Sequence, residues 1–462
     1  MANNMTNPQH SRPDTENGII YAPWERVFKR VLTPFEKFIH RQTTSGLLLM
    51  VSAIIALLLA NSFLAETYQH AIHTPVNLNI GNWGVNMSLH HFINDGLMAL
   101  FFFVVGLELK REIMVGELSD LRQAALPVIA AVGGMVAPAL IYLALNHNSD
   151  AVHGWGIPMA TDIAFAVGAL TLLASRVPKA LVTFLVALAI ADDLGAVLVI
   201  ALFYTQELAL NWLSVSAALV ILLMTFNVIG IRKVIPYFLV AVLLWYALLQ
   251  SGVHATIAGV LGAFTVPARS KYDPALFVDR VKQQIRLFAA NCKQHDSLMT
   301  NEKLHPIVQN LEESIRNVQT PLQKLEDTWH LPVAFVVIPV FSLFNAGIPI
   351  QISTLGETFT HPVMLGVLLG LLFGKFIGIT GACWLALRLG IGQLPTGTRF
   401  SQIAGVSVLG GIGFTMSIFI AQLGFSTQPE YLLMAKTGIL SASLFSGLLG
   451  FAWLWWLGRK TA

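Results

Sequence analysis

The chain has 462 residues, of which 55% are hydrophobic and 11% carry a charged side chain, and its mean hydropathy is +0.66. Soluble domains carry about 25% charged residues, so this composition excludes an ordinary soluble domain and favours a protein that crosses a membrane repeatedly. The formal net charge of +3 is small, and no nucleic-acid partner is expected.

The polar segment 1–44 precedes the first apolar run and predicts a cytoplasmic tail. Within it, between residues 24 and 39, apolar side chains fall on one helical face and basic side chains on the other. This pattern is typical of an amphipathic helix that lies at the membrane surface and makes contact with lipid. The apolar face consists of Trp24, Val27, Phe28, Val31, Leu32, Phe35, Phe38 and Ile39.

Apolar windows of the length that crosses a bilayer recur through the rest of the chain. They predict an all-α polytopic membrane protein with twelve transmembrane helices. Spans one to eight occupy residues 45–267, a polar cytoplasmic insert occupies 268–330, and spans nine to twelve occupy 331–458. The predicted spans are 45–64, 91–109, 124–145, 155–174, 179–203, 212–230, 234–250, 252–266, 331–347, 362–388, 400–424 and 431–457.

The basic residues predict the orientation. With a cytoplasmic N-terminus, the tail and the connections after even-numbered spans hold all but two of the 28 Lys and Arg residues, and the opposite loops hold none. Multi-pass proteins retain positive charge on the cytoplasmic side, so both termini are expected there. Of the two exceptions, Lys436 is close enough to the outer end of its span to extend to the headgroups, whereas Lys375 is in the middle of span ten.

Two segments outside the spans carry recognisable patterns. Residues 76–87 alternate apolar and polar side chains on either side of Gly81-Asn82, which predicts a β-hairpin outside the membrane. The insert 268–330 carries apolar residues at alternating spacings of four and three from Leu304 to Leu325, interrupted by Pro306 and Pro321. This pattern predicts a helical seam, either within a hairpin packed on itself or in a coil that joins two chains.

Charged residues inside predicted spans are the strongest functional signal. Each costs at least ~2.5–3.5 kcal/mol at the bilayer centre, so such residues are candidates for ion or proton transfer. Span four contains Asp162, span five contains Asp192 and Asp193, and span ten contains Lys375. Span two contains Asp95 near its outer end, where a hydrogen bond between helices is an alternative to a functional role.

The adjacent pair Asp192 and Asp193 is the most informative of these. Neighbouring residues point ~100° apart on a helix, so one small polar pocket cannot hold both carboxyl groups. Two like charges ~5 Å apart repel by ~3 kcal/mol at an effective dielectric constant of ~20, and burial adds to the cost of ionisation. Protons and hard cations are therefore expected to compete for the pair, which is the minimal requirement of an exchanger.

Spans four and eleven both contain residues that interrupt helices. Pro158 and Gly168 flank Thr161-Asp162, and span eleven contains Gly405, Gly410, Gly411 and Gly413. These two spans are the middle members of triplets, spans three to five and ten to twelve, that run in opposite directions. Interrupted middle helices in opposed triplets predict inverted repeats with two broken helices that cross in mid-membrane.

Several motifs closely resemble the bacterial NhaA sodium/proton antiporters, and the resemblance covers about residues 40–268 and 325–458. Inverted repeats are a known property of that family, so the repeat pattern is not independent support for it. The resemblance implies electrogenic exchange of internal Na⁺ or Li⁺ for more than one external proton in the bacterial inner membrane, without a cofactor. The motifs are Thr161-Asp162-Ile163-Ala164-Phe165, Ala191-Asp192-Asp193-Leu194-Gly195, Ser251-Gly252-Val253-His254-Ala255-Thr256, Gly374-Lys375 and Gly411-Ile412-Gly413-Phe414-Thr415-Met416-Ser417.

The resemblance also implies roles for individual residues. Asp192 and Asp193 would bind the cation and the protons, while Asp162 and Lys375 would face the two interrupted helices with Thr161 nearby. The residues implied in the response to pH, with activation at neutral to alkaline pH, are Glu108, Glu112, Glu326 and His254. The hairpin at 76–87 matches the family element that joins two protomers into a homodimer.

The chain departs from the family pattern in two places. The insert at about 268–324 is much longer than the usual connection. It precedes Leu325-Glu326-Asp327, where the best-known family pattern has Glu followed by His. Asp327 therefore puts the pH threshold in doubt, although not the transport chemistry.

Two other functions use buried carboxylates. An intramembrane aspartyl protease could use Asp162 and Asp192, but neither lies in a Gly-x-Gly-Asp motif and such an enzyme has no use for Lys375. A proton-gated cation channel needs weak, transient binding, whereas a carboxylate pair would hold a dehydrated cation too tightly for rapid flow. A secondary transporter, and not an enzyme, is expected.

Overall fold

The computed structural model describes residues 15–16, 19–20, 42–80, 83–116, 118–205, 208–270, 274–291, 303–349 and 355–458. The amphipathic helix expected at 24–39 lies outside these residues. Within them, nine helices are long and apolar enough to cross a membrane, and eleven if each of two bent helix pairs counts as one span. The chain is therefore an all-α polytopic membrane protein, and twelve spans with inverted repeats stays a prediction.

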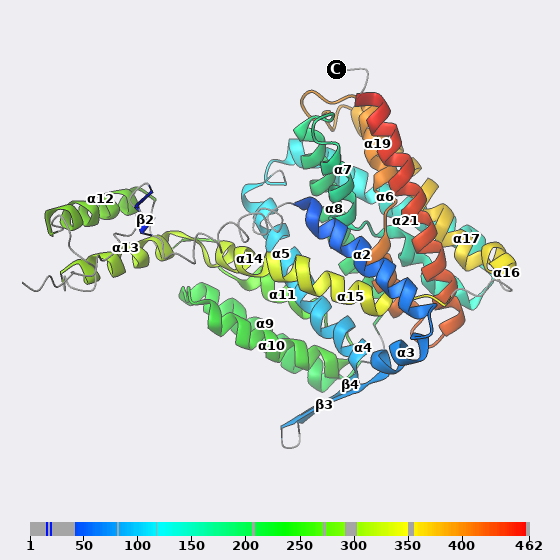
Figure 1. The fold of residues 1–462 in the computed structure, drawn as a ribbon, viewed down its shortest axis with the longest axis horizontal. Helices are drawn as coiled ribbons and strands as arrows, with labels where there is room; N and C mark the ends of the chain where they lie inside the picture. Colours follow the sequence, from blue (N-terminus) through cyan, green and yellow to red (C-terminus); the bar gives the residue numbers. More distant parts are fainter. Residues whose placement is uncertain are drawn as a thin grey trace, which may run out of the picture.

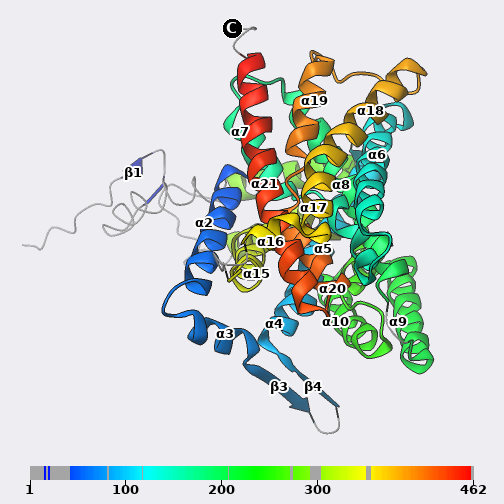
Figure 2. The same ribbon diagram turned by 90° about the vertical axis from the view of Figure 1, so that its right-hand side faces the viewer.

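The helices form one elongated bundle with a hairpin at one end (Figures 1 and 2). In the first half they are α2 (Gln42–Ala60), α3 (Ala65–His73), α4 (Leu89–Phe92), η1 (Ile93–Leu97), α5 (Met98–Val115), α6 (Leu121–Asn146), η2 (Asp150–Met159), α7 (Ile163–Leu172), α8 (Lys179–Phe203), α9 (Leu210–Ile229), α10 (Val234–Ser251) and α11 (Ile257–Thr265). In the second half they are α12 (Pro274–Asn291), α13 (Leu304–Val318), α14 (Pro321–Pro332), η3 (Val333–Val337), α15 (Ile338–Asn345), α16 (Leu355–Thr360), α17 (Pro362–Leu369), η5 (Gly370–Gly374), α18 (Lys375–Arg388), α19 (Phe400–Leu409), α20 (Phe414–Gly424) and α21 (Pro429–Gly458).

The eighth predicted span is much shorter than expected. Its helix, α11, has nine residues, because α10 ends at Ser251, the next residue Gly252 has a positive φ of 82°, and the chain stays non-helical until Ile257. The short helix packs very closely on α5. A Cβ atom at Gly259 would lie 2.1 Å from the carbonyl oxygen of Ala99, so only glycine permits this approach.

The interruptions predicted in spans four and eleven are present. In span four the 3₁₀ helix η2 ends at Met159, residues 160–162 are not helical, and α7 begins at Ile163. In span eleven α19 ends at Leu409 and α20 begins at Phe414, with a bend of 49° between them. The two breaks touch, because the backbone N–H of Asp162 donates to the carbonyl oxygen of Ile412 at 2.7 Å.

Strands β3 (Pro75–Ile80) and β4 (Trp83–Ser88) pair antiparallel where the sequence predicts a hairpin. They extend from the bundle at the end opposite the C-terminus (Figure 2). Successive spans run in opposite directions, so each span has one end on this hairpin side and the other on the far side.

The insert differs from its predicted form in one respect. Helices α12 and α13 pack together and lie to one side of the bundle, as Figure 1 shows. The predicted seam is divided, however, since α13 ends at Val318 and a new helix begins at Pro321. Thr320 caps that helix through a reciprocal bond pattern with Gln323, which favours a helix start here. This helix continues through η3 into α15, so the ninth span begins on a helix that starts at Pro321 and not at residue 331.

Candidate ion-binding site

The two broken spans meet at residues 160–162 and 410–413, here termed the crossing. Asp162 joins the two spans at this point. It is the N-cap residue of α7, and its Oδ1 accepts a hydrogen bond from the Phe165 N–H at 3.0 Å. Its Oδ2 accepts from the N–H of Thr415 at 3.1 Å and from the Thr415 hydroxyl at 2.5 Å, in the first turn of α20. A carboxylate near a helix N-terminus is favoured by the helix dipole and the unpaired N–H groups, and here one carboxylate serves two helices.

Further bonds join the non-helical residues at the crossing. The Thr161 hydroxyl donates to the carbonyl oxygen of Gly410 at 2.9 Å. Gly413 lies close to the other broken span, because an added Cβ would be 3.1 Å from the Ala160 carbonyl oxygen, and on its own helix that Cβ would be 2.2 Å from Ser417 Oγ. Of the span-eleven glycines that suggested an interruption, Gly413 therefore also lies at the close approach of the two broken spans.

Lys375 forms a buried ion pair with Asp192. Its Nζ atom lies 2.6 Å from Asp192 Oδ2, and each of the two residues is 1% exposed. The lysine is placed by close packing of span ten on α6, since a Cβ at Gly374 would lie 2.7 Å from the Cα of Pro138. A buried charge needs a partner of opposite sign, and this pair supplies one.

Asp193 has a different environment from its neighbour. The residue is fully buried, and neither carboxyl oxygen has a hydrogen-bond partner among the residues that the structure describes. Its electrostatic neighbours include Asp192, Asp162 and Lys375. An ionised carboxylate left in this position would be strongly destabilising, so the group is satisfied only by a bound proton or a bound cation.

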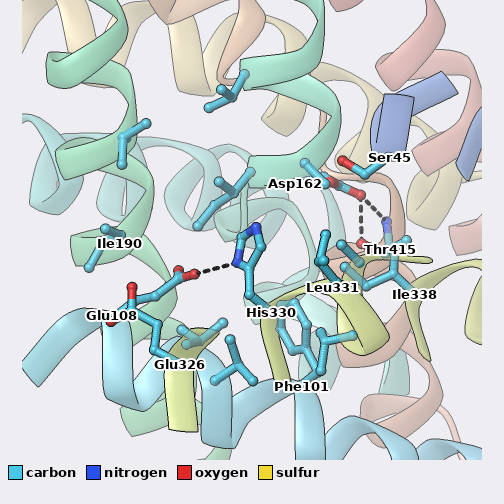
Figure 3. Close-up of a pocket in the computed structure, with 18 of the residues that line it drawn as sticks. Ser45, Phe101, Glu108, Asp162, Ile190, Glu326, His330, Leu331, Ile338 and Thr415 are labelled. Atoms are coloured by element: carbon cyan, nitrogen blue, oxygen red, sulfur yellow. Dashed lines mark hydrogen bonds and ion pairs between the residues drawn. The ribbon is translucent and has the colours of Figure 1, made fainter. Parts of the chain in front are cut away.

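A cavity of about 640 Å³ connects the crossing to the far side of the bundle (Figure 3). It is lined by Asp162 and Thr415 at one end and by Glu108, Glu326 and His330 nearer the far side. Of the described residues that line it, none is Asp192 or Asp193. The cavity therefore reaches the crossing, whereas the aspartate pair is enclosed behind it.

Charged side chains from α5 and α14 are linked to one another at the far-side end of the cavity. Arg111 lies 3.2 Å from Glu326 and 3.1 Å from Glu112, measured between guanidinium nitrogens and carboxyl oxygens. His330 Nδ1 lies 3.2 Å from Glu108 Oε1, and both side chains project into the cavity in Figure 3. Three of the four residues expected in the pH response thus meet in one cluster.

The remaining predicted residues lie elsewhere. His254 is in the non-helical segment before α11, on the hairpin side, where its Nε2 lies 2.6 Å from the carbonyl oxygen of Tyr204. Asp95 is paired with His91 on its own helix at 2.9 Å. Asp162, Asp192, Asp193, Lys375 and Thr161 come together, as expected; His254 does not join the acidic cluster.

Sequence reasoning missed three residues of this region. Thr415 lies in the motif 411–417, where a hydroxyl in the first helical turn after a glycine break could have indicated it. His330 and Arg111 complete the cavity cluster, and the histidine lies one helical turn after Glu326. Although Asp327 occupies the position where the family pattern has a histidine, the same helix thus brings another histidine into the cavity.

Replacing Thr415 with Val is expected to destabilise the protein by about 1.5–3 kcal/mol, because it removes a hydrogen bond to a buried carboxylate and keeps the side-chain shape. Thermal unfolding of the purified protein measures this loss. Thr437→Val is a matched control, since the Thr437 hydroxyl donates to Leu433 on its own helix at 2.9 Å. Equal melting temperatures for the two variants would show that the bond to Asp162 contributes nothing.

Known proteins resemble this chain over most of its length. The family model described as Na⁺/H⁺ antiporter 1 matches residues 36–454. The chain is 58% identical to the Na⁺/H⁺ antiporter NhaA 1 of Saccharophagus degradans over 437 residues, which are 95% of this chain and 94% of the relative. It is 52% identical to the Na⁺/H⁺ antiporter NhaA of Sulfurimonas denitrificans over 441 residues, 96% of this chain and 99% of the relative. It is also 51% identical to the NhaA of Syntrophobacter fumaroxidans, over 94% of this chain and 93% of that relative. The chain, a multi-pass membrane protein and not an enzyme, therefore belongs to the NhaA-type Na⁺/H⁺ antiporter family.

Proposed function

We propose that the protein is an electrogenic antiporter that exports Na⁺ or Li⁺ in exchange for more than one inward proton, with Asp192 and Asp193 as the shared site. The observation that carries this proposal is the unpartnered, fully buried carboxyl group of Asp193 beside the Asp192–Lys375 ion pair. In this environment the group is stable only when a proton or a cation neutralises it. Two ligands that compete for one site are exchanged and do not travel together.

Oxygen ligands for a hard cation are available at this site. Carboxylate, hydroxyl and carbonyl oxygens suit such ions. Asp193 can supply both of its carboxyl oxygens, and Thr161 lies beside Asp192. Among the described residues no three His, Cys, Asp or Glu side chains form a metal cluster, so hydroxyl or main-chain oxygens would complete the coordination.

The ion pair supplies a reason for electrogenic exchange. A cation that binds both carboxylates competes with the Lys375 ammonium for Asp192, which accepts its hydrogen bond at 2.6 Å. Loss of that contact leaves a buried ammonium, whose charged form is disfavoured, and a proton is then released from the lysine. A second proton leaves Asp193 as the cation enters, so more than one proton is exchanged for each monovalent cation.

The path and its regulation follow from the cavity. We place the far side in the cytoplasm of a bacterium, with both termini there, because the basic residues gather on that side of the sequence-based topology. Glu108 and Glu326 then lie on the internal entry route, with Glu112 bound to Arg111 beside them. These three residues would respond to cytoplasmic pH, while His254 would respond from the outer side. Hairpin 75–88 would join two protomers in the inner membrane.

Vesicle transport tests the proposal. Added Na⁺ or Li⁺ should dissipate a preformed pH gradient in everted vesicles that contain the protein, with activity that falls as the pH is lowered because protons then occupy the site. A charge-sensitive dye should report net charge movement in the same vesicles. Entry of Na⁺ without coupled proton movement would instead identify a channel, and dissipation without charge movement would rule out electrogenic exchange.

A further inference from the structure

The cavity lies in a seam between two groups of helices. The first group, termed the triplets, contains α6, η2, α7 and α8 together with α17, η5 and α18–α21. The second group contains α2, then α4, η1 and α5, and then α14, η3 and α15. The triplets contribute Asp162, Val186 and Thr415 to the cavity wall, and the other group contributes Glu108, Glu326 and His330. On the far side the two groups are therefore separated by open space.

On the hairpin side the same seam is closed by a network of polar side chains, here termed the amide latch. Gln422 of α20 donates from Nε2 to Asn345 Oδ1 at 2.9 Å, and His90 Nε2 lies 2.9 Å from the same oxygen. Asn345 in turn donates from Nδ2 to Asn94 Oδ1 at 2.8 Å. Gln422 belongs to the triplets and the other three residues belong to the second group, so the latch spans the seam.

Beneath the latch, closer to the crossing, an aromatic contact closes the seam a second time. Phe419 of α20 packs against Phe102 of α5, with ring centroids 5.5 Å apart, and against Phe341 of α15, with centroids 6.3 Å apart. All three side chains are buried. Phe419 and Phe341 precede Gln422 and Asn345 by about one turn, so the two layers are stacked along the seam.

We propose that the amide latch and the aromatic contact form the gate on the hairpin side, and that the latch residues determine how often the ion site opens there. This inference rests on the proposed antiport function, because it assigns the second opening of an alternating-access cycle. Such cycles move one helix group as a body against the other around a fixed site. Opening this side separates Gln422 from Asn345, and water then replaces the lost hydrogen bonds.

The chemistry of the latch suits a gate that must open repeatedly. An amide hydrogen bond contributes little net stability, because the separated groups bond to water instead. The bonds are directional, however. The fully buried Asn345 accepts a hydrogen bond from Gln422 of the triplets and donates one to Asn94 of its own group. The latch thus fixes the closed position without a large barrier to leaving it.

Cysteine accessibility tests the proposal in the full-length protein. Ala421 is fully buried next to Gln422 and provides a reporter through Ala421→Cys, with Cys292 and Cys383 replaced by Ser and Ala. A membrane-impermeant thiol reagent is applied to the hairpin side of oriented vesicles. Loss of one latch bond in Gln422→Leu should raise the labelling rate roughly fivefold, because one net hydrogen bond no longer favours the closed state.

Two matched controls carry the same reporter and lose amide hydrogen bonds that do not cross the seam. Asn61 donates to the Ile348 carbonyl oxygen at 2.7 Å outside the triplets, and Asn146 donates to the Pro362 carbonyl oxygen at 3.1 Å between the two triplets. Asn61→Ala and Asn146→Ala should leave the labelling rate unchanged. The decisive result is the labelling rate in protein that still exchanges Na⁺ for protons. If Gln422→Leu and these controls are labelled at equal rates, the proposed gate is wrong, whereas the antiport function is unaffected.

A second experiment covers the case in which Gln422→Leu does not fold. A short bifunctional, reducible thiol cross-linker is applied to the Asn345→Cys/Gln422→Cys double variant. Cross-linking should stop antiport, and reduction should restore it, because the seam can no longer part on this side. Undiminished exchange in fully cross-linked protein would contradict the proposal, whereas absence of exchange in the unmodified wild type would refute the antiport function itself.

Discussion

Vesicles that contain the Asp193→Asn variant should no longer dissipate a pH gradient when Na⁺ is added, and the Asp192→Asn variant should behave in the same way. Each change removes a charged ligand from the pair. A hydrogen bond or ligand contact to a charged group contributes about 1.5–3 kcal/mol, so the apparent affinity for Na⁺ should fall at least roughly tenfold. Asparagine also cannot release a proton in exchange for a cation, so coupled transport should be lost at every pH.

Stability separates the two variants. Asp193 has no hydrogen-bond partner to lose among the described residues, so Asp193→Asn should melt at the wild-type temperature or above it. Asp192→Asn leaves Lys375 without its partner and should melt at a lower temperature. Asp95→Asn is the control, because Asp95 is also buried but is paired with His91 away from the site. Na⁺-dependent proton movement in the Asp193→Asn variant would remove this residue from the proposed mechanism.

The Lys375→Ala variant should lose about 3–5 kcal/mol of stability, which is the usual effect of leaving one member of a buried ion pair alone. Its melting temperature should fall accordingly, and transport should fall with it because Asp192 must then be neutralised by a proton. Lys436→Ala is the matched control: this lysine is also on a spanning helix, α21, but forms no ion pair in the described structure.

A double variant distinguishes the ion pair from a general packing effect. Asp192→Asn combined with Lys375→Gln removes both charges, and it should be more stable than either single variant because no unpaired charge is left in the interior. Purely additive losses of stability would show that the 2.6 Å contact carries no coupling energy. Intact transport by Lys375→Ala at every pH would show that the lysine takes no part in exchange.

The principal charged residues could be identified from the sequence because a charge within an apolar span is rare and costly. Their partners could not be identified in the same way. Lys375 and Asp192 are 183 positions apart, and local periodicity does not indicate which spans are neighbours. The sequence left open whether Lys375 faces the broken helices alone or also counters the ionised aspartates, and the structure pairs it directly with Asp192. Thr415 was overlooked for the same reason, since its partner Asp162 is 253 positions away.

Helix boundaries were predictable where a local rule applies. Thr161-Asp162 before an apolar run and the glycines of span eleven mark the two breaks correctly. Pro321 marks an interruption of the apolar spacing, and α14 begins there; the continuation of this helix into the ninth span was not anticipated. The short α11 was read as a full span because hydropathy reports composition and does not report whether the backbone is helical.

The carboxylate of Asp162 also limits how the protein can move. It bonds to the first turns of both α7 and α20, so neither half-helix can be displaced alone without leaving buried N–H groups unpaired. The two broken spans are therefore joined at this carboxylate, and a displacement of either is transmitted to the other. Movement about the seam would therefore leave the crossing intact as a single unit, while the two helix groups shift relative to each other around it.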